Sequence, residues 1–356
     1  RKDLALYRGL LANNGEWPLV SDGPVLKSGS SSGRVMELRR RLAASGDLAA
    51  EEVKSGESFD ERLRGSVIFF QKRHGLKADG TVAPATLEAL NVPLKQRLRQ
   101  IELNMERLRW ILGNSEQRSI VVNIADFKLE VIEKGKSVLS MKGVVGKPYQ
   151  STPVFTARMT YMIINPAWNI PESIARKEIL KKIKNNPHYL AEQNINVFKG
   201  WGPQQEIIDP QAVDWSELTE KTLPYHFRQE PGPLNPLGRL KFMLPNKFDV
   251  YLHDTPARQL FSQNVRTFSH GCMRIEKPLE LAEYVLRENA GWTREKLLAA
   301  IKTGAEKTVL IPKPLNVHFL YLTAWVDDDG VLQFRNDIYK EDMRLDQALL
   351  SKQSLK

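Results

Sequence analysis

The chain contains a single cysteine, Cys272, in 356 residues. No intramolecular disulfide can therefore form, and a zinc site built from several cysteines is excluded by the same count. The fold has to be stabilised by burial of apolar side chains, and a chain of this length can bury a sizeable core in two or three compact units. Its content of 42% hydrophobic and 26% charged residues is typical of a globular protein.

The formal net charge of +10 favours a general attraction to polyanions. The basic residues are scattered and accompany no nucleic-acid-binding motif, so we expect no nucleic-acid partner. The sequence contains no run of about 18 apolar residues and no basic segment followed by an apolar one at its start. Because the chain begins at Arg1, we expect membrane attachment only through an N-terminal segment that this sequence lacks.

Apolar residues recur at helical spacing through the first third of the chain. We expect residues 1–33 to be an N-terminal remnant with one short helix, ending in a flexible linker at 28–33, where the sequence is Ser-Gly-Ser-Ser-Ser-Gly. Residues 34–93 predict a small helical domain, and residues 94–117 predict a connecting amphipathic helix. The apolar positions of the small domain include Val35, Leu38, Leu42, Phe59, Leu63, Val67 and Phe70.

Strand-like alternation replaces the helical spacing from residue 118 onward. We expect residues 118–345 to form a mainly β domain, either a sandwich or a barrel, and residues 346–356 to form a C-terminal tail. The strands expected in this domain include 159–164, 240–244, 250–253, 308–311 and 317–326, with helices near 278–290 and 293–303. The predicted fold class is therefore α+β.

Residues 168–236 interrupt the β pattern with tryptophans, many prolines and a helical stretch at 173–183. An insertion of this kind between strands is typical of a lid or a binding loop. A small packed subdomain without ligand contact fits the same residues equally well. Under the first interpretation the segment caps the site, and Trp168 at its start is a candidate for substrate contact.

The cysteine lies in a Ser-His-Gly-Cys-Met-Arg segment at 269–274, and His253 precedes it by 19 residues. A thiol becomes a nucleophile when a base or a cation ionises it, and an imidazole can supply that base. Gly271 permits a sharp turn of the backbone, so its amide and that of Cys272 can point at a developing oxyanion. This combination indicates nucleophilic catalysis by a thiolate.

The combination of His-Asp-Thr-Pro at 253–256 with Ser-His-Gly-Cys-x-Arg at 269–274 resembles the signature of the L,D-transpeptidase (YkuD-type) catalytic domain. Asn-Pro-x-Trp-Asn at 165–169 and Leu-Gly-Arg at 237–239 agree with that family. The segment at 70–90, which contains the turns His-Gly and Asp-Gly, resembles a three-helix peptidoglycan-binding module. The whole chain thus resembles the large type of L,D-transpeptidase that carries such a module.

The resemblance implies a role for each residue of the motif. Cys272 would be the nucleophile, and His253 would be the general base, oriented by the main-chain carbonyl of Asp254. The amides of Gly271 and Cys272 would form the oxyanion hole. Arg274 would hold the turn or a carboxylate of the substrate. The substrate contacts implied are Tyr251, Ser269, His270, Arg274 and Trp168.

The resemblance also implies the reaction, an acyl transfer. The donor would be a tetrapeptide stem of peptidoglycan, whose terminal D-Ala leaves as a thioester forms on Cys272. The side-chain amine of a second stem would then attack the thioester and complete a 3→3 cross-link. No metal or organic cofactor is implied, carbapenem β-lactams would be covalent inhibitors, and the location would be the periplasm or cell envelope of a bacterium.

Three alternatives stay open at this point. A cell-wall cysteine peptidase or carboxypeptidase would use the same thiol with water as the acceptor. A metal hydrolase would use His253, Asp254, His270 and Cys272 as zinc ligands, although the sequence has no His-Glu-x-x-His motif. A non-catalytic wall-binding protein would leave Cys272 as a small buried hydrophobe, which is the usual state of a lone cysteine.

Overall fold

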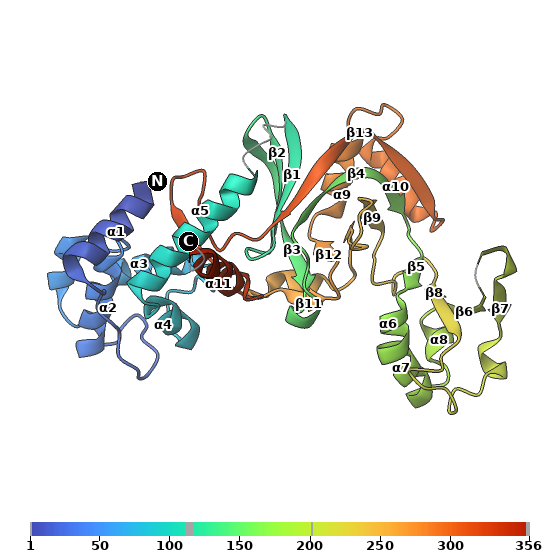
Figure 1. Cartoon of the computed structure of the whole chain (residues 1–356), viewed down its shortest axis with the longest axis horizontal. Coiled ribbons are helices and arrows are strands. Elements are labelled where there is room, and N and C mark those ends of the chain that lie inside the picture. The colour runs from blue at the N-terminus through green and yellow to red at the C-terminus, as the bar shows by residue number, and fades with distance from the viewer. Residues whose placement is uncertain (1, 112–116, 201, 354–356) are drawn as a thin grey trace. The chain divides into compact units, whose positions relative to one another are not determined.

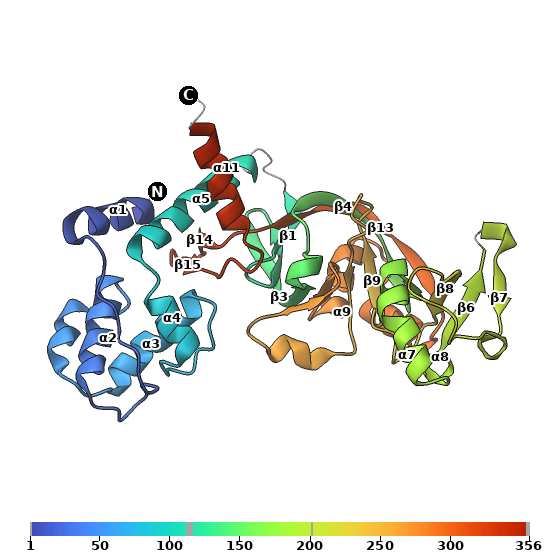
Figure 2. The same cartoon turned by 60° about the horizontal axis from the view of Figure 1, so that its bottom comes forward.

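A computed structural model describes residues 2–111, 117–200 and 202–353, and the chain divides into two compact units (Figures 1 and 2). Unit 1 combines Arg1–Glu116 with Asn123–Asp126 and Leu320–Lys356, whereas unit 2 comprises Gln117–Val122 and Phe127–Phe319. The residues after Phe319 thus belong to unit 1 and not to the β domain expected over 118–345. Within the described ranges, no helix is both long enough and apolar enough to cross a bilayer.

Unit 2 is built on one large sheet. Among the described residues its strand order is β11-β3-β12-β10-β9-β4-β13-β1-β2, and β2 also pairs with β3. This last pairing joins β2, at one end of the order, to β3, the second strand from the other end, and closes the sheet into a barrel. The closure confirms the expectation of a mainly β sandwich or barrel. The strands are β1 (Arg118–Asn123), β2 (Lys128–Glu133), β3 (Lys136–Gly146), β4 (Phe155–Ile164), β9 (Leu240–Met243), β10 (Leu252–His253), β11 (Thr267–Ser269), β12 (Met273–Ile275) and β13 (Lys307–Leu320).

The barrel strands bury one face because apolar and polar residues alternate along them. Leu129 and Val131 of β2 are fully buried, and Glu130 between them is not. Helix α9 (Pro278–Leu286) begins with a proline at its first turn, as helices tolerate well, and buries Leu281 and Val285. Helix α10 (Arg294–Lys302) follows, with the side chain of Thr293 capping its N-terminus.

Strand β13 differs from the sequence-based expectation of two strands at 308–311 and 317–326. Pro312 and Pro314 lie between the two expected strands, but the structure has one strand from Lys307 to Leu320. The pairing of β13 with β4 changes register between Leu310 and Leu315. A bulge of this kind accommodates prolines that cannot donate to the ladder, so the strand continues past them.

The insertion at 168–236 has a core of its own. Its second sheet has the order β5-β8-β6-β7, and its buried residues include Ile174, Ile183, Val197 and Phe227. The insertion is therefore a packed subdomain, and its action as a mobile cap stays a prediction. Its elements are β5 (Trp168–Ile170), α6 (Glu172–Ile174), a π-helical turn (Ala175–Ile179), α7 (Leu180–Asn185), α8 (Tyr189–Glu192), β6 (Ile195–Lys199), β7 (Glu206–Ile208) and β8 (Tyr225–Gln229).

Unit 1 contains the expected three-helix module. Its helices are α2 (Gly33–Ala44), α3 (Glu61–Arg73) and α4 (Pro84–Leu90). The side chain of Asp60 caps α3 by accepting a hydrogen bond of 2.8 Å from the amide of Leu63. Seven of the apolar positions predicted for the module are each at most 1% exposed: Val35, Leu38, Leu42, Phe59, Leu63, Val67 and Phe70.

Residues 20–30 pack against the three-helix module, so the prediction of a flexible linker at 28–33 is wrong. The amide of Gly29 donates to the carbonyl of Phe59 (3.1 Å), and the amide of Phe59 donates to the carbonyl of Ser30 (2.8 Å). Val20 and Leu26 are buried in the core of the three-helix module. Composition alone suggested flexibility, but these pairings use the backbone groups that a free linker would leave to water.

The C-terminal segment is also ordered as part of unit 1. It contains β14 (Ala324–Val326), β15 (Leu332–Phe334) and α11 (Glu341–Gln353), so the tail expected at 346–356 is helical as far as residue 353. Helix α5 (Leu94–Ile111) corresponds to the expected connecting helix. Residues 112–116 of that prediction, and residues 354–356 of the tail, lie outside the described ranges.

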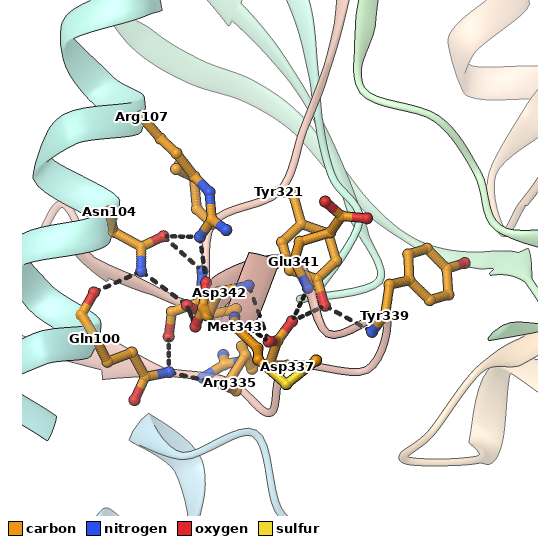
Figure 3. Close-up of polar contacts among 12 residues, drawn as sticks. Gln100, Asn104, Arg107, Tyr321, Arg335, Asp337, Tyr339, Glu341, Asp342 and Met343 are labelled. Atoms are coloured by element: carbon orange, nitrogen blue, oxygen red, sulfur yellow. Dashed lines mark hydrogen bonds and ion pairs between the residues drawn. The ribbon is translucent and has the colours of Figure 1, made fainter. Parts of the chain in front are cut away.

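A polar network ties α5 to the C-terminal segment (Figure 3). Asn104 donates to the hydroxyl of Thr323 (2.7 Å), which in turn donates to Asp342 (2.6 Å). Arg107 forms an ion pair with the same Asp342 carboxylate. Asp337 accepts from the hydroxyl of Tyr321 (2.8 Å) and from the amides of Glu341 (2.8 Å) and Asp342 (2.9 Å), so it caps the first turn of α11.

We predict that Asp337→Ala lowers the free energy of unfolding of the protein by roughly 1–3 kcal/mol, because four donors, the amide of Met343 included, lose their acceptor at once. Urea denaturation of the variant and the parent measures the difference. The matched control is Asp328→Ala, at an exposed position in the turn between β14 and β15. It should change the free energy of unfolding by less than about 0.5 kcal/mol. An equal effect of the two substitutions would contradict the capping role.

Candidate active site

The pairing of three strands of unit 2 assembles the site. β10 pairs antiparallel with β9, which sets His253 opposite Lys241, and parallel with β12, which sets His253 beside Arg274. Neighbouring parallel strands need a crossover of about a dozen residues or more. The segment after His253, which contains a short helical turn (Arg258–Ser262) and β11, supplies that crossover and leads directly into Cys272. The long gap between His253 and Cys272 in the sequence is therefore a consequence of the topology.

His253 is held in one orientation and one tautomer. Its side chain is buried, with 5% exposed, and Nδ1 lies 2.6 Å from the carbonyl oxygen of Asp254. A carbonyl can only accept, so Nδ1 carries the proton and Nε2 is left unprotonated in the neutral ring. Burial, followed by the positive charge of Arg274 and then that of Lys241, lowers the pKa of His253 to about 3. The imidazole is thus a neutral acceptor at physiological pH.

The thiol of Cys272 is also neutral. Desolvation raises the pKa of Cys272 above its ordinary value, although hydrogen bonds from the backbone and hydroxyl of Tyr251 and the charge of Lys241 oppose this change. The sulfur lies 3.6 Å from the carbonyl oxygen of Asp249, to which the thiol can donate. This acceptor favours the protonated form. At rest the site therefore contains a neutral thiol at Cys272 and a neutral imidazole at His253.

The turn that carries Cys272 is braced from inside. Gly271 has φ +115°, a conformation that favours glycine, and its carbonyl accepts from the hydroxyl of Thr152 (2.8 Å). The hydroxyl of Ser269 accepts from the amide of Gly271 (3.2 Å) and donates to the carbonyl of Cys272 (2.5 Å). Ser269 is 2% exposed, so its hydroxyl shapes the turn itself. The amide of Gly271 already has an acceptor in this state, which leaves the amide of Cys272 as the freer donor for an oxyanion.

The side chain of Asp254 has a structural task that the sequence did not reveal. One carboxylate oxygen accepts from the amide of Arg239 (2.8 Å). Gly238, with φ +64°, lies so close that an added Cβ would come within 2.4 Å of that carboxylate. Asp254 therefore contributes its carbonyl to His253 and its carboxylate to the Gly238 turn, which accounts for the Leu-Gly-Arg segment quoted above.

His270 connects the turn that carries Cys272 (residues 269–272) to the insertion. Its Nε2 lies 2.6 Å from a carboxylate oxygen of Glu178, in the π-helical turn Ala175–Ile179. Single π-helical turns inside helices are frequent at functional sites. Sequence reasoning missed Glu178 because the residue is 92 positions away from its partner and stands among several other charged residues.

The remaining predicted contacts separate into two groups. Tyr251 forms hydrogen bonds with the thiol of Cys272 through its backbone and hydroxyl. Its ring also packs edge-on against that of His253, with the ring centroids 5.6 Å apart. Trp168 packs against the core of the insertion, so its contact with substrate stays a prediction. Across the described residues, no group of three or more His, Cys, Asp or Glu side chains is arranged to hold a metal ion.

Comparison with known proteins agrees with this geometry. The model of the L,D-transpeptidase catalytic domain family (YkuD) matches residues 117–310, which is more than half of the chain. The chain therefore belongs to the L,D-transpeptidase family. A second family model, provisionally described as a peptidoglycan binding domain, matches residues 31–90.

Individual relatives cover different parts of the chain. A Haemophilus influenzae protein with the provisional name L,D-transpeptidase is 32% identical over 249 residues, which are 70% of this chain and 49% of that protein. A Bacillus licheniformis protein with the provisional name N-acetylmuramoyl-L-alanine amidase is 38% identical over 71 residues, 20% of each chain. The chain thus spans about half the length, or less, of the curated relatives it matches. The crystal structure of an L,D-transpeptidase from Stackebrandtia nassauensis shares 11% identity, with 85% of this chain and 96% of that chain covered and a TM-score of 0.29.

We predict that alkylation of Cys272 by iodoacetamide accelerates with rising pH through a midpoint above that of an ordinary cysteine. The raised pKa keeps the thiol protonated below this midpoint, and only the thiolate reacts. Because the chain has one cysteine, the same protein unfolded in urea is the control and should show the ordinary midpoint. A rate that is already at its plateau below pH 7 would show a resting thiolate–imidazolium pair instead.

Proposed function

We propose that the protein is a cysteine L,D-transpeptidase that forms 3→3 cross-links in peptidoglycan. The observation that carries the proposal is a neutral, oriented imidazole at His253 on β10, the strand that pairs with β12 directly after Cys272. The family match over residues 117–310 supports the reaction class. The match over residues 31–90 supports a peptidoglycan partner and a location in the cell envelope, the periplasm in our proposal.

In the proposed mechanism, Cys272 attacks the carbonyl of the third residue of a tetrapeptide stem. Nε2 of His253 takes the thiol proton as the sulfur–carbon bond forms, and the amide of Cys272, with that of Gly271, stabilises the oxyanion. The imidazolium then protonates the nitrogen of the departing D-Ala, and a thioester remains. His253 next accepts a proton from the side-chain amine of a second stem, which attacks the thioester and forms the new amide bond. The sulfur of Cys272 leaves, and the imidazolium returns the proton to it.

The low pKa of His253 leaves Nε2 unprotonated at the start of the cycle, and it also makes the imidazole a weak base. Once formed, the imidazolium is a strong acid toward the leaving amine. The hydrogen bond from Nδ1 to Asp254 keeps the ring aligned through both proton transfers. A peptidase would follow the same first half and differ only in the acceptor, so the identity of the products decides between the two.

We predict that Cys272→Ala lowers turnover at least about 10³-fold, because the bond to sulfur cannot form. The assay incubates the protein with purified disaccharide-tetrapeptide and follows the products by mass spectrometry. The intact protein should gain the mass of the stem without D-Ala, and cross-linked dimers should appear. Turnover by the alanine variant, or hydrolysed tripeptide without dimers, would overturn the nucleophile or the transferase proposal respectively.

His253→Ala should reduce acylation of Cys272 at neutral pH far more than His270→Ala does. The hydrogen bond from Nδ1 of His253 to Asp254 leaves its Nε2 as an acceptor on the strand that pairs with β12, whereas Nε2 of His270 is engaged by Glu178 of the insertion. Time courses of acylation by a carbapenem, which we propose as a covalent inhibitor, measure both variants. The reverse order would exchange the two roles.

We also predict that the insertion at 168–236 acts as a cap. Acylation of Cys272 by a carbapenem should slow hydrogen exchange in the π-helical turn Ala175–Ile179, because this turn reaches the catalytic turn through Glu178 and His270. Glu178→Gln should weaken the effect, while Glu217→Gln, at an exposed position of the same insertion, should leave it intact. Unchanged exchange on acylation would show a static subdomain.

A further inference from the structure

Two cations lie on either side of the catalytic imidazole. The register of β9, β10 and β12 sets Lys241, His253 and Arg274 side by side across three strands. Their neighbours Phe242, Leu252 and Met273 are fully buried in the barrel core. Since successive side chains of a strand point to opposite faces, Lys241, His253 and Arg274 share the other face. This row of charges is continuous with the thiol, because Cys272 is two residues before Arg274.

Neither cation is neutralised by a carboxylate in contact. In the part of the chain that the structure describes, Lys241 and Arg274 form no ion pair, and the ammonium of Lys241 lies 3.9 Å from the centre of the Tyr251 ring. Glu306 attracts Lys241 at longer range, but one of its oxygens accepts from the amide of Ala167 (2.6 Å). The Nε atom of Arg274 is buried, and no hydrogen-bond partner for it is present among the described residues.

This arrangement is costly without an anion. Desolvation lowers the pKa of Lys241 and that of Arg274, and both groups are attracted by a negative charge on Cys272. Buried or half-buried charges normally have a partner, because transfer out of water is unfavourable unless hydrogen bonds or an opposite charge compensate. The resting thiol is neutral and does not supply that charge. An anion that arrives with the substrate would.

We infer that Lys241, together with Arg274, forms a subsite for the terminal carboxylate of the donor peptide, on the leaving-group side of the bond that Cys272 attacks. The inference rests on the proposed function and extends it to the recognition of one chemical group. Lys241 would act as a specificity-determining residue: it would select stems that end in a free carboxylate one residue beyond the scissile carbonyl.

The length of the chain restricts which carboxylate fits. Consecutive Cα atoms of the donor peptide are about 3.8 Å apart. The terminal carboxylate of the departing residue is therefore only one residue away from the carbonyl that Cys272 attacks, close enough to reach a group beside His253. Adjacent strands lie about 4.8 Å apart. The long side chains of Lys241 and Arg274 are therefore able to reach a carboxylate placed beside His253. The same contacts would hold the leaving amine close to His253, which has to protonate it.

A second way to use Lys241 is possible on the same geometry, and the experiment separates the two. If the ammonium only stabilises the developing thiolate, its removal affects all donors equally. If it binds the terminal carboxylate, its removal affects only donors that have one. The comparison therefore pairs a protein substitution, Lys241→Met, with a ligand substitution, a tetrapeptide stem whose terminal carboxylate is converted to an amide.

Binding is measured by calorimetry on the Cys272→Ala protein, which needs no turnover, for the free-acid and the amide peptide. We expect the Cys272→Ala protein to prefer the acid by about 10- to 100-fold in Kd, the usual range for a charged hydrogen-bonded contact. Lys241→Met in this background should remove most of that preference by weakening the acid alone. Lys241→Arg should retain it. Lys296→Met, an exposed lysine on α10, is the matched control and should behave as the parent.

Equal affinity of the Cys272→Ala protein for acid and amide would overturn the inference, as would an equal loss for both peptides on Lys241→Met. If Lys241→Met does not fold, as judged by thermal unfolding, Lys241→Gln replaces it, and persistence of the acid preference in that variant would likewise overturn the inference. Failure of the proposed function is seen separately, as the absence of dimers from the parent enzyme, and leaves the binding comparison readable.

Discussion

The parallel pairing of β10 with β12 is the constraint on which the site depends. It places the strand that ends in His253 beside the strand that begins after Cys272, and the pairing of β10 with β9 adds Lys241 on the other side. Two neighbouring parallel strands have to be linked by a crossover connection. Here the crossover from β10 leads into the turn that carries Cys272. Because Gly271, Ser269 and Thr152 fix this turn through its own backbone, the thiol is positioned by structure that does not depend on the substrate.

Electrostatics then set the protonation states. Burial and then two neighbouring cations lower the pKa of His253 and keep it neutral, while desolvation raises the pKa of Cys272 and keeps it protonated. A thiolate–imidazolium pair would place a third positive charge between Lys241 and Arg274, which explains why the neutral pair is favoured at rest. The proton transfer becomes favourable only as negative charge develops on the sulfur or arrives with the substrate. In this account the activation of the nucleophile is coupled to occupancy of the site.

Local sequence patterns predicted the helices and strands better than the contacts that distant segments make with one another. Helical spacing identified the buried positions of the three-helix module, and alternation indicated a mainly β domain. Errors arose where distant segments decide the outcome. Residues 28–33 look flexible by composition but pair with Phe59, and the prolines of β13 are accommodated by a register shift against β4. The motif indicated Cys272 and His253, whereas Lys241 and Glu178 are ordinary charged residues until the strand register and the fold of the insertion bring them to the site.

In the proposed function, the insertion would connect substrate capture with chemistry. Glu178 lies in a turn of π-helix, where the regular hydrogen bonding of the helix is interrupted, and it contacts a residue two positions before the nucleophile. A displacement of the insertion core would therefore act on His270 first and, through the short turn to Cys272, on the orientation of the thiol. The hydroxyls of Ser269 and Thr152 hold the same turn through hydrogen bonds to its carbonyls. A movement of the insertion would therefore change the orientation of the nucleophile without displacing the whole turn.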